Sequence, residues 1–184
     1  KMTFLIKIEC MILTFLLLFA LLAGVGPLTV YAADSTWVVG THSNDEIVNA
    51  MKAAATGDTI TLNGKGTVTL GAIDTIAGTV IMSPDMGESL TITGGDFTRE
   101  VSINCKDNAG TVVLGGKYAL LVVAQGNAVL DGCTVSGSDS AALQMNGGSL
   151  TLRNNSTVQT LAATDSAIKI TGNVGAINIE SGSL

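Results

Sequence analysis

The stretch that decides the fold is Gly147-Gly148-Ser149-Leu150-Thr151-Leu152, which repeats the pattern of Gly126-Asn127-Ala128-Val129-Leu130. Leu130 recurs as Leu152 one repeat later. Further equivalents are Val135 with Val158, Leu143-Gln144-Met145 with Ile168-Lys169-Ile170, and Asp139-Ser140-Ala141 with Asp165-Ser166-Ala167. These pairs define a drifting period of roughly 22 to 26 residues that holds about three short strands. Such a period is typical of one coil of a parallel β-helix, whose coils bury one another's apolar faces.

Short β segments recur along the chain at intervals of about 8 to 12 residues. In most of them, as in Thr59-Ile60-Thr61-Leu62, aliphatic residues alternate with polar ones, so that one face of the strand is apolar. Regular spacing alone would also fit a sandwich or a barrel, and the internal repetition favours the solenoid. We expect strands at residues 59–62, 67–70, 79–82, 90–93, 101–104, 111–114, 120–124, 128–130, 143–145, 150–152, 168–170 and 176–179.

A clear amphipathic helix is predicted ahead of these strands, over residues 43–55. Ser43 and Glu46 have the spacing of a capping box, and Gly57 stands just past the expected end. Ile47, Met51 and Ala54 or Ala55 would line one face at helical spacing. A short strand is expected before the helix, at Trp37-Val38-Val39.

This order of strand, helix and Gly57-Asp58-Thr59-Ile60-Thr61-Leu62 resembles the start of right-handed parallel β-helix proteins of the pectin-lyase-like superfamily. The segment at 147–152 resembles the coils of bacterial surface and adhesin-type members. The resemblance implies an all-β fold, a right-handed parallel β-helix of about five coils whose open end is covered by an N-terminal amphipathic capping helix. We therefore divide the chain into a strand and capping helix at 33–57 and coils at 58–184.

Residues 1–32 have the pattern of a secretory signal peptide. Lys1 and Lys7 precede the apolar run Met11–Val25, and Val30-Tyr31-Ala32 offers small residues at a signal peptidase site. An uncleaved membrane anchor is the alternative, but it usually needs about 20 apolar residues without helix breakers. We expect cleavage after Ala32 or Ala33, which places the protein outside the cell or on the cell surface, in a source that we take to be bacterial.

The composition excludes some partners. Two of the nine basic and one of the fifteen acidic residues lie in the first 32 positions, which leaves 7 basic and 14 acidic residues and a formal charge of −7. Such a charge repels nucleic acid and anionic lipid headgroups, so we expect no nucleic-acid partner and membrane contact only through the export signal. The aromatic residues after position 32 are Trp37, Phe97 and Tyr118, which suits a narrow aliphatic core.

No catalytic, cofactor-binding or metal-binding residue is predicted. Family enzymes that cleave acidic polysaccharide cluster calcium-binding carboxylates beside a basic residue. Here the nearest equivalent is Asp131 beside Arg153, which the repeats place on adjacent coils. The repeats place Asp139 beside Asp165 in the same way. A small-ligand or calcium site is one reading, and a surface ion pair with two turn-forming aspartates is the favoured one.

His42 and Trp37 lie next to the helix. His42 is the single histidine of the chain and has no second ligand nearby in the sequence, so we expect a structural or solvent-exposed role. Exposed aromatic rings can stack on sugars, but the position of Trp37 favours the core beneath the helix.

Two further features have alternatives. Cys105 and Cys133 follow the export signal, so a disulfide is permissible, while two buried thiols are favoured. Asn154-Asn155-Ser156 fits a glycosylation acceptor, and a ladder of turn asparagines is the simpler interpretation.

We predict a non-catalytic adhesion, stalk or extracellular binding role, with extracellular polysaccharide or a host or cell-surface molecule as ligand. Gly182-Ser183-Leu184 repeats the opening of a coil, so further coils or a partner are expected to cover the C-terminal end. The alternative function is a polysaccharide lyase or glycoside hydrolase whose active site lies in coils beyond residue 184.

Overall fold

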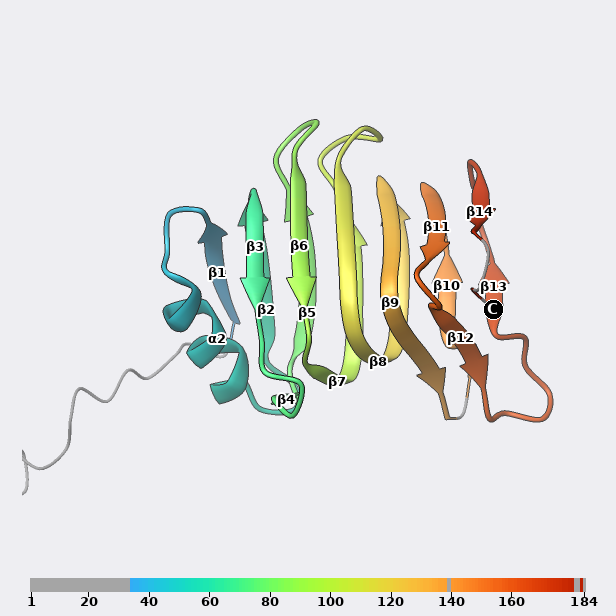
Figure 1. Ribbon diagram of the computed structural model, residues 1–184, viewed down its shortest axis with the longest axis horizontal. Coiled ribbons are helices and arrows are strands. Elements are labelled where there is room, and N and C mark those ends of the chain that lie inside the picture. The colour runs from blue at the N-terminus through green and yellow to red at the C-terminus, as the bar shows by residue number, and fades with distance from the viewer. Residues whose placement is uncertain (1–33, 139, 181–182, 184) are drawn as a thin grey trace, which may run out of the picture. The chain divides into compact units, whose positions relative to one another are not determined.

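The computed structural model describes residues 34–138, 140–180 and 183, which form a right-handed parallel β-solenoid. In Figure 1, strands β2 (Thr59–Gly64) and β5 (Thr79–Pro84) point upward behind β3 (Gly66–Thr69) and β6 (Ser89–Thr93), which point downward. The chain meanwhile advances from left to right, so its path is right-handed, as connections between parallel strands almost always are. This confirms the predicted fold class.

The strands lie on three faces, and β7 (Asp96–Asn104), β8 (Thr111–Gln125) and β9 (Asn127–Gly137) bend from one face to the next. The first face holds β1 (Asp34–Val39), β2, β5, the ends of β7 and β8, β10 (Leu143–Met145) and β13 (Ile168–Ile170). The second face holds β3, β6, the starts of β8 and β9, β11 (Ser149–Arg153) and β14 (Ile177–Ile179). The third face holds β4 (Thr75–Ile76), the start of β7, the middle of β8, the end of β9 and β12 (Thr157–Thr160).

The described residues contain six coils, which begin on the first face at Thr59, Thr79, Glu100, Leu120, Leu143 and Ile168. This is one more than the approximate number expected. The step from Ile60 to its partner Val80 is shorter than the step from Leu143 to its partner Ile168, so the early coils are shorter than the period read from the later ones. The register confirms the predicted stacking of Leu130 on Leu152 and of Val135 on Val158.

The helix α2 (Asn44–Ala53) lies beside the first coil at the N-terminal end of the solenoid (Figure 1). Ser43 and Glu46 form the predicted capping box, and Ile47 and Met51 are buried in the core. The predicted C-terminal end is wrong: Ala54 already leaves the helix in extended backbone. Gly57 belongs instead to a tight turn in which the Ala55 amide donates to the Asp58 carboxylate at 2.8 Å.

The core is one aliphatic column enclosed by the three faces. It includes Leu62, Leu90, Leu114, Leu130 and Leu150, which are all fully buried. Alternation along each strand turns the intervening polar residues outward. Phe97 and Tyr118 stack at the third face with ring centroids 4.7 Å apart and planes 9° apart.

The strands of the third face are missing from the sequence prediction. No strand was expected at 75–76, 96–97, 116–118, 133–137 or 157–160, although the structure has one at each. The predicted strands 111–114 and 120–124 also proved to be two parts of β8. Each missed segment holds one or two inward side chains between Gly, Asp, Ser or Thr, so its alternation is too short to distinguish it from a turn.

The corner between the second and third faces requires left-handed backbone. Gly116 has φ +106°, and a Cβ there would lie 2.3 Å from the Gly94 carbonyl oxygen on the coil below. On a later coil the same corner uses Asn154 and Asn155, with φ values of 54° and 61°. Asparagine tolerates this region better than most residues, which supports the turn interpretation of this pair.

Replacing Leu114 by alanine should lower the free energy of unfolding by about 2–5 kcal/mol, because a fully buried side chain of the central coils is removed. Val113 is the matched control, since it is adjacent in β8 but faces outward and is only half-buried. Val113→Ala should cost less than about 1 kcal/mol. Urea denaturation of both variants measures the difference, and equal losses would contradict the assignment of the two faces.

Candidate functional site

Asp131 and Arg153 are brought together as the repeats predict. They are register partners in β9 and β11, and the Arg153 guanidinium donates from Nη2 to Asp131 Oδ2 at 2.8 Å. Hydrogen bonds from Asn154 and then Arg153 lower the pKa of the Asp131 carboxyl. Both side chains are partly exposed, and Arg153 Nε is buried without a hydrogen-bond partner. The geometry is that of a surface ion pair, which contributes about 0–1 kcal/mol to stability.

Three more ion pairs, which were not predicted from the sequence, also join residues about one coil period apart. Lys52 pairs with Asp74 at 2.8 Å, Lys65 with Glu88 at 2.9 Å, and Lys106 with Asp85. In each pair the partners are separated in the sequence by one coil period, so a search for opposite charges at that period would have found them. The pairs of Lys65 with Glu88 and of Lys106 with Asp85 place compensating charges on successive coils, whereas Lys52 ties helix α2 to the first coil.

The other predicted residues have structural surroundings. Asp139 lies outside the described residues, and Asp165 is exposed in the loop after β12. His42 Nδ1 accepts a hydrogen bond from the Val38 amide at 3.1 Å, and its ring meets Trp37 edge-on at 5.0 Å. Trp37 is partly buried and packs against the core, as expected.

Cys105 and Cys133 are free and buried. Burial raises the pKa of the Cys133 thiol to about 12 and is also the main cause that raises the pKa of Cys105. Both thiols are therefore protonated near neutral pH and are poor nucleophiles. They fill space in the core, in agreement with the favoured interpretation.

Ser156, the third residue of the possible glycosylation acceptor, is fully buried. Its hydroxyl accepts from the Cys133 amide at 3.1 Å and donates to the Arg153 carbonyl at 2.7 Å. The Ser156 side chain therefore provides hydrogen-bond partners for two backbone groups at a corner between coils. A buried amide left unpaired there would cost about 1–3 kcal/mol.

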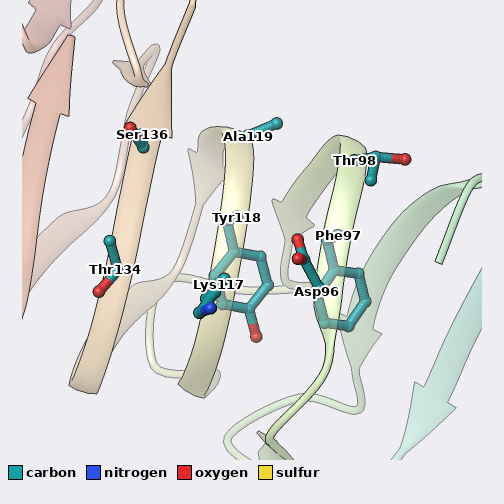
Figure 2. Close-up of a pocket in the computed structure, with 8 residues that line it drawn as sticks. All are labelled: Asp96, Phe97, Thr98, Lys117, Tyr118, Ala119, Thr134 and Ser136. Atoms are coloured by element: carbon teal, nitrogen blue, oxygen red, sulfur yellow. The ribbon is translucent and has the colours of Figure 1, made fainter. Parts of the chain in front are cut away.

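A groove crosses the corner between the third and first faces. It consists of two adjoining hollows of about 270 and 320 Å³ that share Thr98 and Ala119. Figure 2 shows the first hollow, where Asp96, Lys117 and Thr134 come from three successive coils. The second hollow continues around the corner and is lined by Thr79, Thr98, Arg99, Glu100, Ala119, Leu120, Ser138 and Ser140. We refer to the two hollows together as the corner groove.

A difference in corner length forms one edge of the corner groove. Phe97 pairs with Tyr118 and Glu100 with Leu120, so Thr98 and Arg99 on the second coil stand beside Ala119 alone on the third. This β-bulge adds one residue, which pushes the chain outward relative to its neighbour. The Thr98 hydroxyl donates to the Ile76 carbonyl at 3.1 Å and holds this edge in place. The small side chain of Ala119 fills little of the space beside it.

Among the described residues, hydroxyl groups and charged side chains of both signs line the corner groove. Asp96 and Lys117 are register partners on neighbouring coils, and Arg99 is followed directly by Glu100. The aromatic rings of Phe97 and Tyr118 lie underneath, 0% and 2% exposed, and the Tyr118 hydroxyl donates inward to the Gly115 carbonyl at 2.9 Å. A ligand would therefore meet polar and aliphatic side chains, including Ala119 and Leu120, rather than aromatic faces.

A third hollow, of about 280 Å³, lies at the corner between the first and second faces. Asn108, Asn127, Ser149 and Asn173 line it. Asn127 Nδ2 donates to the Asn108 carbonyl at 3.2 Å, and the Ser149 hydroxyl bonds to Asn127 Oδ1. These groups mainly satisfy one another, whereas the charged side chains that line the corner groove have no ion-pair partner among the described residues. The corner groove is therefore the stronger candidate for a ligand site.

Comparisons with protein-family models, curated proteins and solved structures found no match to this chain. In the part of the chain that the structure describes, no three His, Cys, Asp or Glu side chains are placed to share a metal ion. Among the same residues, no helix has both the length and the apolar character needed to cross a membrane.

Replacing Asp131 by asparagine should remove a contribution to stability that depends on pH. Because the folded-state pKa of Asp131 is lowered, its contribution is present above the unfolded value of about 3.9 and is lost as pH falls through the folded value. Asp131→Asn should thus cost up to about 1 kcal/mol at pH 7 and almost nothing near pH 2. Urea midpoints at the two pH values measure this, with the exposed Asp165→Asn as control. A loss that is equal at both pH values would show that the ionised pair is not its cause.

Proposed function

We propose that this protein is exported and acts outside the cell or on its surface as a non-catalytic binding or adhesion solenoid for polysaccharide. The observation that supports the proposal best is the corner groove, an open channel across three coils whose lining includes threonine and serine side chains. Hydroxyl-rich channels suit carbohydrate, because each sugar hydroxyl can both donate and accept hydrogen bonds.

The construction of the solenoid supports the same role. Continuous parallel pairing from β2 to β13 and ion pairs between coils make a stiff support, and binding sites on rigid elements lose little entropy when they bind. The formal charge of −7 after residue 32 disfavours nucleic acid and anionic membranes as partners. A polysaccharide lyase or glycoside hydrolase with its active site in further coils is the competing proposal.

Export can be tested directly by expressing the full sequence in a bacterial host. The product should be recovered outside the cytoplasm with an N-terminus at Ala33 or Asp34, as cleavage after Ala32 or Ala33 requires. Leu17→Arg puts a charge into the apolar run and should reduce export at least about tenfold, whereas Thr14→Ser should not. A full-length product that stays with the membrane fraction would instead support an uncleaved anchor.

Binding and catalysis can be separated with one set of extracellular polysaccharides. The protein should be retarded in native gels that contain at least one soluble polysaccharide, with a dissociation constant of about 1 μM to 1 mM. It should release no new chain ends from these polymers and no unsaturated product from pectate, with or without calcium. Release of either product would overturn the non-catalytic proposal, and absence of retardation by every polymer would overturn polysaccharide binding.

A further inference from the structure

We infer that the corner groove binds a single chain of an uncharged polysaccharide, rather than the acidic polymer that the family resemblance would suggest. This inference rests on the proposed extracellular binding role and names the ligand class of the same site. Three observations carry it: the charges of the groove, its dimensions and the position of its aromatic rings.

The charges of the described residues that line the corner groove are balanced. Among these residues the cations are Arg99 and Lys117, and the carboxylates are Asp96 and Glu100. Within the described part of the chain none of the four takes part in an ion pair, whereas Lys52, Lys65, Lys106 and Arg153 all do. The described lining thus has charged hydrogen-bonding groups of both signs in equal number, on a protein whose overall charge repels polyanions. An uncharged chain avoids this repulsion.

The dimensions of the groove fit one chain. It spans the second, third and fourth coils, so its width is about two coil spacings, or about 10 Å. The added residue at Thr98 and Arg99 raises one side, and Ala119 keeps the floor open. The raised edge would keep the flat surface of a crystalline polysaccharide away from the floor of the groove, whereas a single polysaccharide chain can lie along that floor.

Recognition inside the groove depends on hydrogen bonds. Phe97 and Tyr118 are buried beneath the floor, so no ring is available for stacking on a sugar there. Thr98, Thr134, Ser136 and Ser140 contribute hydroxyl groups. Those of Thr98, Ser136 and Ser140 are already bonded within the protein, and each can still accept a further hydrogen bond. Arg99 and Lys117 can donate, and Asp96 and Glu100 can accept. Such a lining pairs with sugar hydroxyls and gives no preference for a carboxylate.

Affinity electrophoresis of the full, exported chain can test this with galactomannan and mixed-linkage β-glucan as uncharged probes and polygalacturonate as the anionic probe. We expect at least one uncharged probe to bind at least about tenfold more tightly than polygalacturonate. Raising the salt from about 0.05 to 0.5 M should change the affinity less than about twofold, because screening acts on charged ligands.

Ala119→Trp fills the floor from the outside without touching the core and should weaken binding of the uncharged probe at least about tenfold. Ala72→Trp, on an exposed turn of the first coil and outside the groove lining, is the matched control and should leave affinity within about twofold. The double variant Arg99→Gln with Lys117→Gln should keep affinity for the uncharged probe within about fivefold, since neutral donors remain. Circular dichroism and urea midpoints establish that each variant is folded.

The outcomes distinguish this inference from the proposed function. Binding that survives Ala119→Trp places the ligand elsewhere and overturns the inference alone. Preference for polygalacturonate, abolished by the double variant, also overturns the uncharged ligand while polysaccharide binding stands. Absence of binding to all three probes overturns the inference, and absence of binding to any extracellular polymer overturns the proposed function as well.

Discussion

Every feature of this protein depends on the parallel hydrogen bonding of one coil to the next. The pairing places each residue about 4.8 Å above its equivalent one coil earlier, so a choice of side chain at one position becomes part of a row along the solenoid. Leu62, Met82, Ile103 and Val123 form one such row inside the core. Outside, the same rule produces the ion pairs between Lys65 and Glu88 and between Asp131 and Arg153. A residue is therefore stabilised mainly by its neighbours in the row.

Regular stacking by itself produces flat faces, so a hollow needs a local departure from it. The corner groove arises where the second coil carries Thr98 and Arg99 and the third carries only Ala119. The departure is tolerated because it lies at a corner, where the chain leaves one face for the next and pairing is interrupted in any case. The stacked Phe97 and Tyr118 pack immediately beneath and keep the core closed. A site can thus be made on the outside of a solenoid without a cost to its interior.

The charges of the surface are divided between two roles. Three basic side chains, Lys65, Lys106 and Arg153, link successive coils through ion pairs, and Lys52 links helix α2 to the first coil in the same way. Arg99 and Lys117 are placed differently, in the lining of the corner groove together with Asp96 and Glu100. Ion pairs between layers are set by the repeat, whereas charges in the groove are free to contact a ligand. This difference in placement is the physical basis for treating the groove as a binding site.

The sequence by itself determined the coil, because the recurrence of Leu130 as Leu152 and the alternation of Thr59-Ile60-Thr61-Leu62 specify which side chains face a shared core. It also determined the capping box of Ser43 and Glu46 and the pairing of Asp131 with Arg153, since these depend on local spacing or on one period of the repeat. The strands of the third face and the corner groove were decided only by the tertiary structure. Each third-face strand has too few inward residues to show a period, and the groove depends on a difference of one residue between two coils, which has meaning only once their register is set by hydrogen bonds.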